Sequence, residues 1–445
     1  MRIACVHIPQ LSLQCATRMD PSLRGAAVAV VGSGSIVAMG SGRDRAGLPG
    51  ALTSPVVLAC SRAAWGLGVR LGMTATTARG LSPELRLVNA DTQLERETVR
   101  AIADALLAAS PTVDVGGRLG AGGAHLAMYA EVPAKTRGAS FGERVRELLE
   151  ALGLVGRVGI ADDRFTAWVA AADGGHHGDA WEHAVVTVPR GGSAAFLAPR
   201  PLALLSIAPE VQHMLEALGV RTLGQFAALP APSVGRPVDR QAGGDFQALA
   251  RGESGTLLRP YAPEASIRED IALDGPAAGL GGMDALGALA HRLALRLAGR
   301  ERLASALEVT AVTGEGTRAL TATLVQPTAD IEVLAAALMS AVDGAAVHRL
   351  RVVVTREAIA GEAGAVATET AEQTRDSVFE APISALSVVL SSTGTGDLFE
   401  RSWALEPARP AWEARRDTHR RTRRGKQRRR LVPTAVQPRL FDRSS

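Results

Sequence analysis

The chain has 445 residues, of which 47% are apolar, 21% are charged and 3% are aromatic. This length exceeds what one hydrophobic core holds, so the composition indicates a globular protein of several domains. The three cysteines follow no zinc spacing and suggest no disulfide framework, and no apolar run is long and uncharged enough to cross a bilayer. We therefore expect a cytoplasmic protein with no membrane partner.

The net charge of +4 conceals a strong asymmetry along the chain. From Trp412 to the last residue there are 12 lysines and arginines against 3 acids, which leaves 37 against 42 in the rest. Such a split predicts an acidic body with a basic tail that meets a polyanion. The alternative is a solvated, disordered terminus without a ligand.

The first elements read as buried strands, at residues 3–8 and 26–31. The Gly-Ser-Gly at 32–34 does not complete a dinucleotide-binding fingerprint, because residues 36–39 continue as another strand where a helix would be needed. We therefore do not expect a dinucleotide cofactor.

A helix is predicted at about 92–109, where Thr92 and Glu95 form a capping-box pattern. A second helix at about 140–152 leads into a strand at 156–161. The next segment is rich in glycine and histidine. His176, His177 and His183 could be metal ligands, but no further ligand completes a regular spacing, so we favour a polar linker.

Residues 196–250 are predicted to be helical with short loops, and residues 265–356 give the clearest pattern. Leucines at 286, 289, 293 and 297 form one stripe of a helix. The predicted order is a strand at 267–273, this helix, two strands joined by a turn at 314–316, a second helix, and a last strand at 350–354. This βαββαβ order predicts a small sheet with two helices on one face.

The end of the chain carries a dense cluster of cations between residues 415 and 430, with Asp417 as its single acid. The cluster consists of Arg415, Arg416, Arg420, Arg421, Arg423, Arg424, Lys426, Arg428, Arg429 and Arg430. Charges this dense can neutralise phosphates and release counterions, which gives DNA binding that is salt-dependent and independent of sequence. No aromatic side chain is interleaved, so base stacking is not expected.

The chain from Met1 to about Glu357 resembles a Y-family, lesion-bypass DNA polymerase. The similarity is carried by co-linear passages at Gly68–Thr74, Val158–Ala161 and Leu218–Gly224. It implies an α+β multidomain right hand. Its parts would be a ferredoxin-like palm at 1–11 and 80–173, small fingers at 12–79, a helical thumb with a degenerate helix-hairpin-helix at 184–255, a βαββαβ little finger at 262–357, and a C-terminal extension with a disordered basic tail at 358–445.

The resemblance also locates the metal site, and there the sequence departs from the family. The family's "V-D-x-D" aligns with Val6–Pro9, which puts His7 and Pro9 where two aspartates would stand. Its second carboxylate pair aligns with Leu126 and Ala127. Mg²⁺ prefers carboxylate oxygens, so this alignment implies no catalytic residue, no metal and no cofactor. The alternative is an active, divergent lesion-bypass polymerase.

Two other parts of the polymerase machinery also differ. The family's triphosphate-binding Tyr, Arg and Lys align with Arg62, Trp65 and Trp168. The thumb glycines that would present amides to a phosphate align with residues 208–210, where Pro209 removes a donor and Glu210 repels phosphate. We therefore expect DNA contacts from the little finger and the tail rather than from the thumb.

Gln437-Pro438-Arg439-Leu440-Phe441 is similar to the bacterial peptide that binds the sliding clamp. In such a peptide Leu440 and Phe441 would fill an apolar pocket, while Gln437 would hydrogen-bond beside it. Asp397-Leu398-Phe399 is a poorer internal candidate.

A Y-family-like body, missing carboxylates and a clamp peptide together resemble the ImuB family of non-catalytic polymerase homologues. That resemblance implies a nucleoid-associated adaptor in damage-induced, mutagenic translesion synthesis. Its partners would be DNA, the sliding clamp (β subunit), an ImuA or RecA-like accessory protein, and an error-prone replicative-type polymerase. A DNA-binding protein without a clamp link is a further alternative.

Overall fold

The computed structural model describes residues 1–32, 55–119, 125–172, 183–205, 207–230, 240–255, 257–273, 280–342 and 347–360. Several sequence predictions therefore fall outside the described residues. They concern the strand at 36–39, His176 and His177, Asp397-Leu398-Phe399, the basic cluster from Arg415 to Arg430, and Gln437, Leu440 and Phe441.

A five-stranded sheet forms the centre of the N-terminal body, in the strand order β5-β6-β1-β7-β8. Its members are β1 (Arg2–Ile8), β5 (Val113–Leu119), β6 (His125–Val132), β7 (Arg157–Ala161) and β8 (Ala184–Thr187). Neighbouring strands are antiparallel except for β7 and β8. With α4 (Thr92–Leu107) and α5 (Gly138–Ala151), the chain runs βαββαβ from β1 to β7, which is the ferredoxin-like element order.

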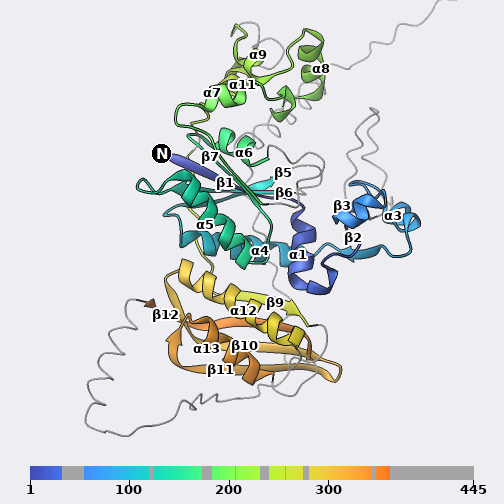
Figure 1. Ribbon diagram of the computed structural model, residues 1–445, viewed down its shortest axis with the longest axis vertical. Coiled ribbons are helices and arrows are strands. Elements are labelled where there is room, and N and C mark those ends of the chain that lie inside the picture. Colours follow the sequence, from blue (N-terminus) through green and yellow to red (C-terminus); the bar gives the residue numbers. More distant parts are fainter. Residues whose placement is uncertain are drawn as a thin grey trace, which may run out of the picture.

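Helices cover both faces of this sheet (Figure 1). Val6, Ile8 and Met128 belong to the core on the side of α4 and α5. The opposite face packs against α6 (Arg164–Ala172), which approaches β7 so closely that a Cβ at Gly159 would lie 2.2 Å from the Ala167 carbonyl oxygen. Glycine is therefore required in the β7 strand at this crossing.

The start of α4 corrects the predicted capping box. Asp91, and not Thr92, caps the helix, because its carboxylate accepts the backbone N–H groups of Gln93 and Leu94. Glu95 is buried and accepts a hydrogen bond from Ser12 in α1 (Leu11–Met19). Asp91 was overlooked because the adjacent threonine fitted the same motif.

A small sheet, β3-β2-β4, forms a separate lobe beside α1 (Figure 1). Its strands are β2 (Val28–Gly32), β3 (Val56–Cys60) and β4 (Arg86–Asn89), and it carries η1 (Pro21–Leu23), α2 (Arg62–Gly66) and α3 (Ala75–Leu81). β4 pairs in parallel with β2. Residues 86–89, which we expected to be in the palm, thus extend the small sheet.

A helical lobe follows β8. It contains α7 (Ser193–Leu197), η3 (Leu202–Leu204), α8 (Pro209–Ala217), α9 (Leu223–Ala227) and α11 (Arg240–Arg251). Leu197, Leu223 and Phe226 are fully buried in its core. The lobe lies at the end of the body opposite to the C-terminal unit (Figure 1), and the helical character expected for 196–250 is confirmed in the described part of that range.

The C-terminal unit has the predicted βαββαβ order. It consists of β9 (Ile267–Ala272), α12 (Leu280–Gly299), β10 (Arg302–Thr313), β11 (Gly316–Thr328), α13 (Ile331–Ala341) and β12 (Val347–Ile359). The sheet order is β11-β10-β12-β9, with all neighbours antiparallel. The four stripe leucines of α12 are buried against the sheet, which confirms the predicted helix face. Within the residues described above, no helix has the length and hydrophobicity to cross a membrane.

Candidate functional site

His7 lies in the middle of a three-strand row at one end of the large sheet. It pairs with Ala127 on β6 and with Arg157 on β7. Residues directly opposite one another in neighbouring strands point to the same face, so these three side chains share the α6 side. His125 is two residues from Ala127 and joins them, with its ring centroid 5.3 Å from that of His7.

Of the two positions aligned with the family's second carboxylate pair, only one lies beside His7. Ala127 shares its face, but Leu126 points to the other side and is 2% exposed in the core against α4 and α5. The backbone of β5 approaches that of β6 closely here, since a Cβ at Gly116 would lie 2.0 Å from the Ala127 carbonyl oxygen. The sequence alignment assigns Leu126 and Ala127 to one site, but their side chains point to opposite faces of the sheet.

His7 is buried and neutral. The residue is 8% exposed, and the Nδ1 atom of its imidazole has no hydrogen-bond partner within the described residues. Burial, together with neighbouring His125 and Arg157, lowers the pKa of His7 to about 3. Arg157 is buried as well, and its Nε donates to the Ala171 carbonyl at the end of α6, at 3.0 Å.

Pro9 follows β1 and is buried, and its carbonyl accepts a hydrogen bond from the side-chain amide of Gln14 at 2.7 Å. Asp114, an acid on the neighbouring region of β5, has other partners. Its Oδ2 accepts from Arg164 at 2.8 Å and from the backbone N–H of Arg259 at 3.0 Å. Pro9 and Asp114 thus have structural roles.

The residues around His7 do not fit a pair of magnesium ions. Among the described residues, no three histidine, cysteine, aspartate or glutamate side chains converge into a metal-binding group. Mg²⁺ needs oxygen ligands, whereas this row offers a methyl group, an imidazole and a guanidinium cation that repels it. His125 and Arg157 were missed from the sequence because their proximity depends on strand register, although the alternation from Ala127 could have indicated His125.

Comparisons with known proteins agree with the N-terminal resemblance. Residues 7–172 match the family model described as the impB/mucB/samB family. A DNA polymerase IV from Dehalococcoides mccartyi strain BAV1 is 30% identical over 178 residues, which is 40% of this chain and 43% of that protein. The enzyme from strain 195 is 29% identical over 182 residues. The chain thus spans less than half the length of the curated relatives it matches.

The chain therefore has a family match over residues 7–172 and a distant, partial similarity to DNA polymerase IV. Among solved structures, the chain is similar to an insertion ternary complex of Dbh DNA polymerase, with 15% identity, a TM-score of 0.46, and coverage of 80% of this chain and 98% of that one. DinB from Sulfolobus solfataricus gives 15% identity and a TM-score of 0.43, with coverage of 81% and 99%.

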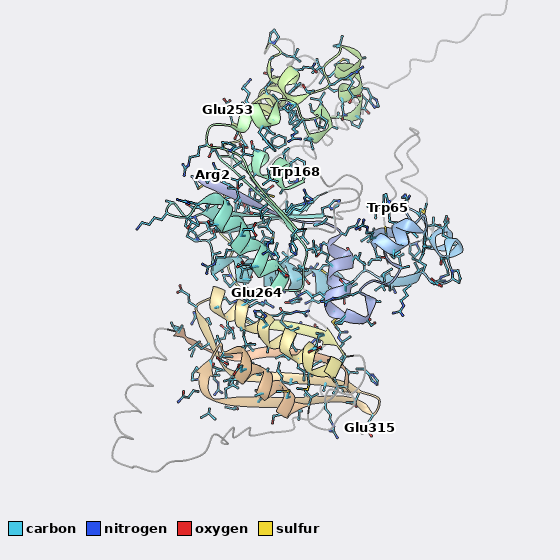
Figure 2. All side chains as sticks on the ribbon, viewed as in Figure 1. Arg2, Trp65, Trp168, Glu253, Glu264 and Glu315 are labelled. Atoms are coloured by element: carbon cyan, nitrogen blue, oxygen red, sulfur yellow. The ribbon has the colours of Figure 1, made fainter. Side chains whose placement is uncertain are left out.

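The positions aligned with the Y-family triphosphate-binding residues lie on different lobes. Arg62 and Trp65 are on α2 of the small lobe, and Trp168 is on α6 of the body (Figure 2). Arg62 is exposed, whereas Trp65 is covered by Arg70, whose guanidinium carbon lies 4.0 Å from the ring centroid. Trp168 packs against Phe165 at 5.7 Å between ring centroids. The two tryptophans therefore serve local packing.

The remaining predicted positions also have local roles. Ala208 precedes α8, Pro209 opens it, and Glu210 is exposed in its first turn. No side chain caps this helix. His183 Nδ1 hydrogen-bonds to the backbone of Gly156.

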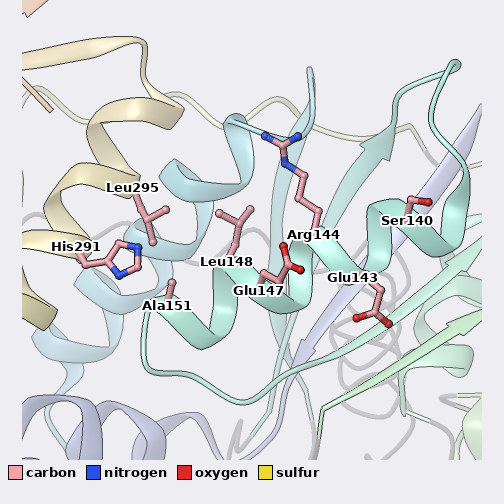
Figure 3. Close-up of a pocket in the computed structure, with 8 residues that line it drawn as sticks. All are labelled: Ser140, Glu143, Arg144, Glu147, Leu148, Ala151, His291 and Leu295. Atoms are coloured by element: carbon pink, nitrogen blue, oxygen red, sulfur yellow. The ribbon is translucent and has the colours of Figure 1, made fainter. Parts of the chain in front are cut away.

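A groove of about 830 Å³ lies apart from the His7 row, between α5 and α12 (Figure 3). Its floor contains Leu148 and Leu295, and its rim carries Glu143, Glu147 and His291. None of the sequence-predicted site residues lines this groove. It marks the junction between the body and the C-terminal unit.

Proposed function

We propose that this chain is a non-catalytic, ImuB-type adaptor of mutagenic translesion synthesis, built on a Y-family polymerase scaffold. The observation that carries the proposal is the row Ala127–His7–Arg157, which stands where the family would bind its metals. Polymerases of this kind need two metal ions to activate the primer hydroxyl and to neutralise the triphosphate. A neutral imidazole beside a cation supports neither task.

A primer-extension assay tests this proposal. We expect the purified protein to add no nucleotide to a primed template in the presence of Mg²⁺ or Mn²⁺, while a DNA polymerase IV extends the same primer. Template-dependent incorporation that co-purifies with the protein would overturn the adaptor proposal. It would instead support the alternative of an active, divergent lesion-bypass polymerase.

The clamp link is proposed from Gln437, Leu440 and Phe441. Burial of two large apolar side chains contributes roughly 1.5–3 kcal/mol each, before ordering costs. We therefore expect Leu440→Ala/Phe441→Ala to weaken binding to the sliding clamp at least tenfold in a titration, by the arithmetic of about 1.4 kcal/mol per factor of ten.

The matched control is Leu398→Ala/Phe399→Ala, which changes the same residue types in the internal candidate. This variant should bind the clamp like the wild type. Equal binding by all three proteins would instead favour a DNA-binding protein without a clamp link.

DNA and two proteins complete the proposed set of partners. The basic cluster from Arg415 to Arg430 would supply most of the DNA affinity. On the C-terminal sheet, Arg351 and Arg349 are both paired with the single acid Asp270, at 2.8 and 3.8 Å. An ImuA or RecA-like accessory protein and an error-prone replicative-type polymerase would bind through residues 358–411.

A further inference from the structure

A buried cluster of charged side chains joins the C-terminal unit to the N-terminal body. Asp104 on α4 accepts hydrogen bonds from Arg296 Nε of α12 at 2.8 Å and from Arg300 Nη2, one residue beyond that helix, at 2.9 Å. The side chains of Asp104 and Arg296 are 0% exposed. These partners are 192 and 196 residues apart in the sequence and belong to different units.

The cluster continues across the junction through Glu269 on β9. One carboxylate oxygen of Glu269 pairs with Arg18 on α1 at 2.6 Å, and the other pairs with Arg296 at 3.0 Å. Arg18 also donates to the Leu152 carbonyl at the end of α5, at 3.0 Å. Asp104 therefore faces two cations of the opposite unit, and Glu269 faces one cation from each side of the junction. These contacts join α1, α4 and α5 of the body to β9 and α12 of the C-terminal unit.

The connection between the helical lobe and β9 is bound to the body along its length. The backbone N–H groups of Arg259 and Tyr261 donate to Asp114 and to the Val113 carbonyl, at 3.0 and 2.6 Å. The Tyr261 hydroxyl donates to Asp104 at 3.0 Å. Glu264, which lies at the junction in Figure 2, pairs with Arg100 of α4. These contacts hold residues 259–264 against the surface of the body.

The backbones also meet at close range. At the end of α12, a Cβ on Gly299 would lie 1.8 Å from the carbonyl oxygen of Asp104. Only glycine permits this contact, which lets the end of α12 approach the α4 backbone closely beside the charged cluster. Removal of one partner of a buried ion pair destabilises the protein, because the remaining charge is buried without compensation. Replacement of one charged side chain of the cluster should therefore weaken the junction between the two units.

We infer that the buried cluster of Asp104, Glu269, Arg18, Arg296 and Arg300 locks residues 267–359 onto the N-terminal body. The two units then move as one piece, and the exposed face of the C-terminal sheet is held in a single orientation. This inference holds for an adaptor and for an active polymerase alike.

Distance measurements between two spin labels test the lock. Thr92 on α4 and Thr323 on β11 are exposed, and the three natural cysteines are buried, so Thr92→Cys/Thr323→Cys directs the labels to these sites in the full chain. We expect one narrow distance distribution in the otherwise unchanged protein. A broad or multi-peaked distribution there would overturn the inference without the need for any further variant.

Two variants attack the lock by different means. Arg296→Met removes the central cation, and Gly299→Leu leaves every charge in place but wedges the helices apart. Each should broaden the distribution several-fold. The control is Arg146→Met, which removes the exposed pairs with Glu143 and Glu150 on α5 and should leave the distribution narrow. A narrow distribution in both lock variants, with unchanged far-UV circular dichroism, would refute the proposed role of the cluster.

Discussion

The imidazole of His7 is enclosed between Ala127 and Arg157, at the position where the Y-family alignment expects a metal-binding aspartate. Its low pKa has a consequence for stability. An unfolded histidine titrates near 6.5, whereas folded His7 binds a proton only near pH 3. Between these values the unfolded chain binds more protons, so this residue contributes stability above pH 6.5 that is lost as the pH falls toward 3.

We therefore expect His7→Asn to make the protein less sensitive to acid. The wild type should lose about 2 kcal/mol more of its unfolding free energy between pH 7 and pH 5 than the variant does, on the order expected from linkage. Urea denaturation at the two pH values measures this difference. His348→Gln on the exposed part of β12 is the control and should keep the wild-type loss. An equal loss in His7→Asn would show that His7 is not held neutral.

At this scale, the alignment proposes which residues stand at the positions of the family's acids, but not which residues surround them. His7 and Ala127 followed from local motifs. Arg157 became a neighbour of His7 only through the pairing of β1 with β7, whose residues are about 150 positions apart in the chain. Short motifs carry no information on that register, so the cation beside the imidazole could not be predicted.

Among the elements, α4 connects local sequence most directly to the lock. It is 16 residues long, begins beside the small lobe and carries Asp104 near its end. The periodicity of its apolar residues predicted the helix, but the cap was assigned one residue too late. The βαββαβ order of residues 267–359 was predicted fully, because alternating strands and a leucine stripe are both local patterns.

The cap assignment gives a direct test. Asp91→Ala should lower the unfolding free energy by about 1 kcal/mol, since it leaves two N-terminal amides without an acceptor. Thr92→Ala is the control and should have a much smaller effect, because the Thr92 side chain caps nothing in the structure. Chemical denaturation measures the unfolding free energy of both variants, and a larger loss for Thr92→Ala would identify Thr92 as the cap of α4.

For the molecule as a whole, the charge asymmetry predicts how DNA binding depends on salt. A chain ending at residue 411 lacks 12 cations and 3 acids and retains the acidic body. Each phosphate neutralised by a cation steepens the fall of log K with log salt concentration by about 0.9 on double-stranded DNA.

We expect truncation at residue 411 to weaken DNA binding equally for unrelated sequences and to flatten the salt dependence by several units of slope. Titration of fluorescent duplexes at several salt concentrations measures both quantities. A full-length variant with the arginines of the basic cluster replaced by glutamine should reproduce the truncation. A slope that stays unchanged would assign DNA binding to the folded units.

The arrangement of the lobes could not be predicted from the sequence. The ion pairs that join Asp104 to Arg296 and Arg18 to Glu269 link residues 192 and 251 positions apart. Isolated charges on predicted helices normally indicate a solvated face, and nothing local distinguishes these from the rest. Only the packing of α12 on α4 reveals that they are buried.

Leu126 limits how an acid could be introduced at a position that the alignment assigns to a metal ligand. Its side chain lies on the apolar side of β6, away from His7. A carboxylate reintroduced there would be buried without a cation, at a cost of several kcal/mol, and it would still face the wrong direction. Of two acids introduced at Leu126 and Ala127, we therefore expect only the carboxylate at residue 127 to lie beside His7.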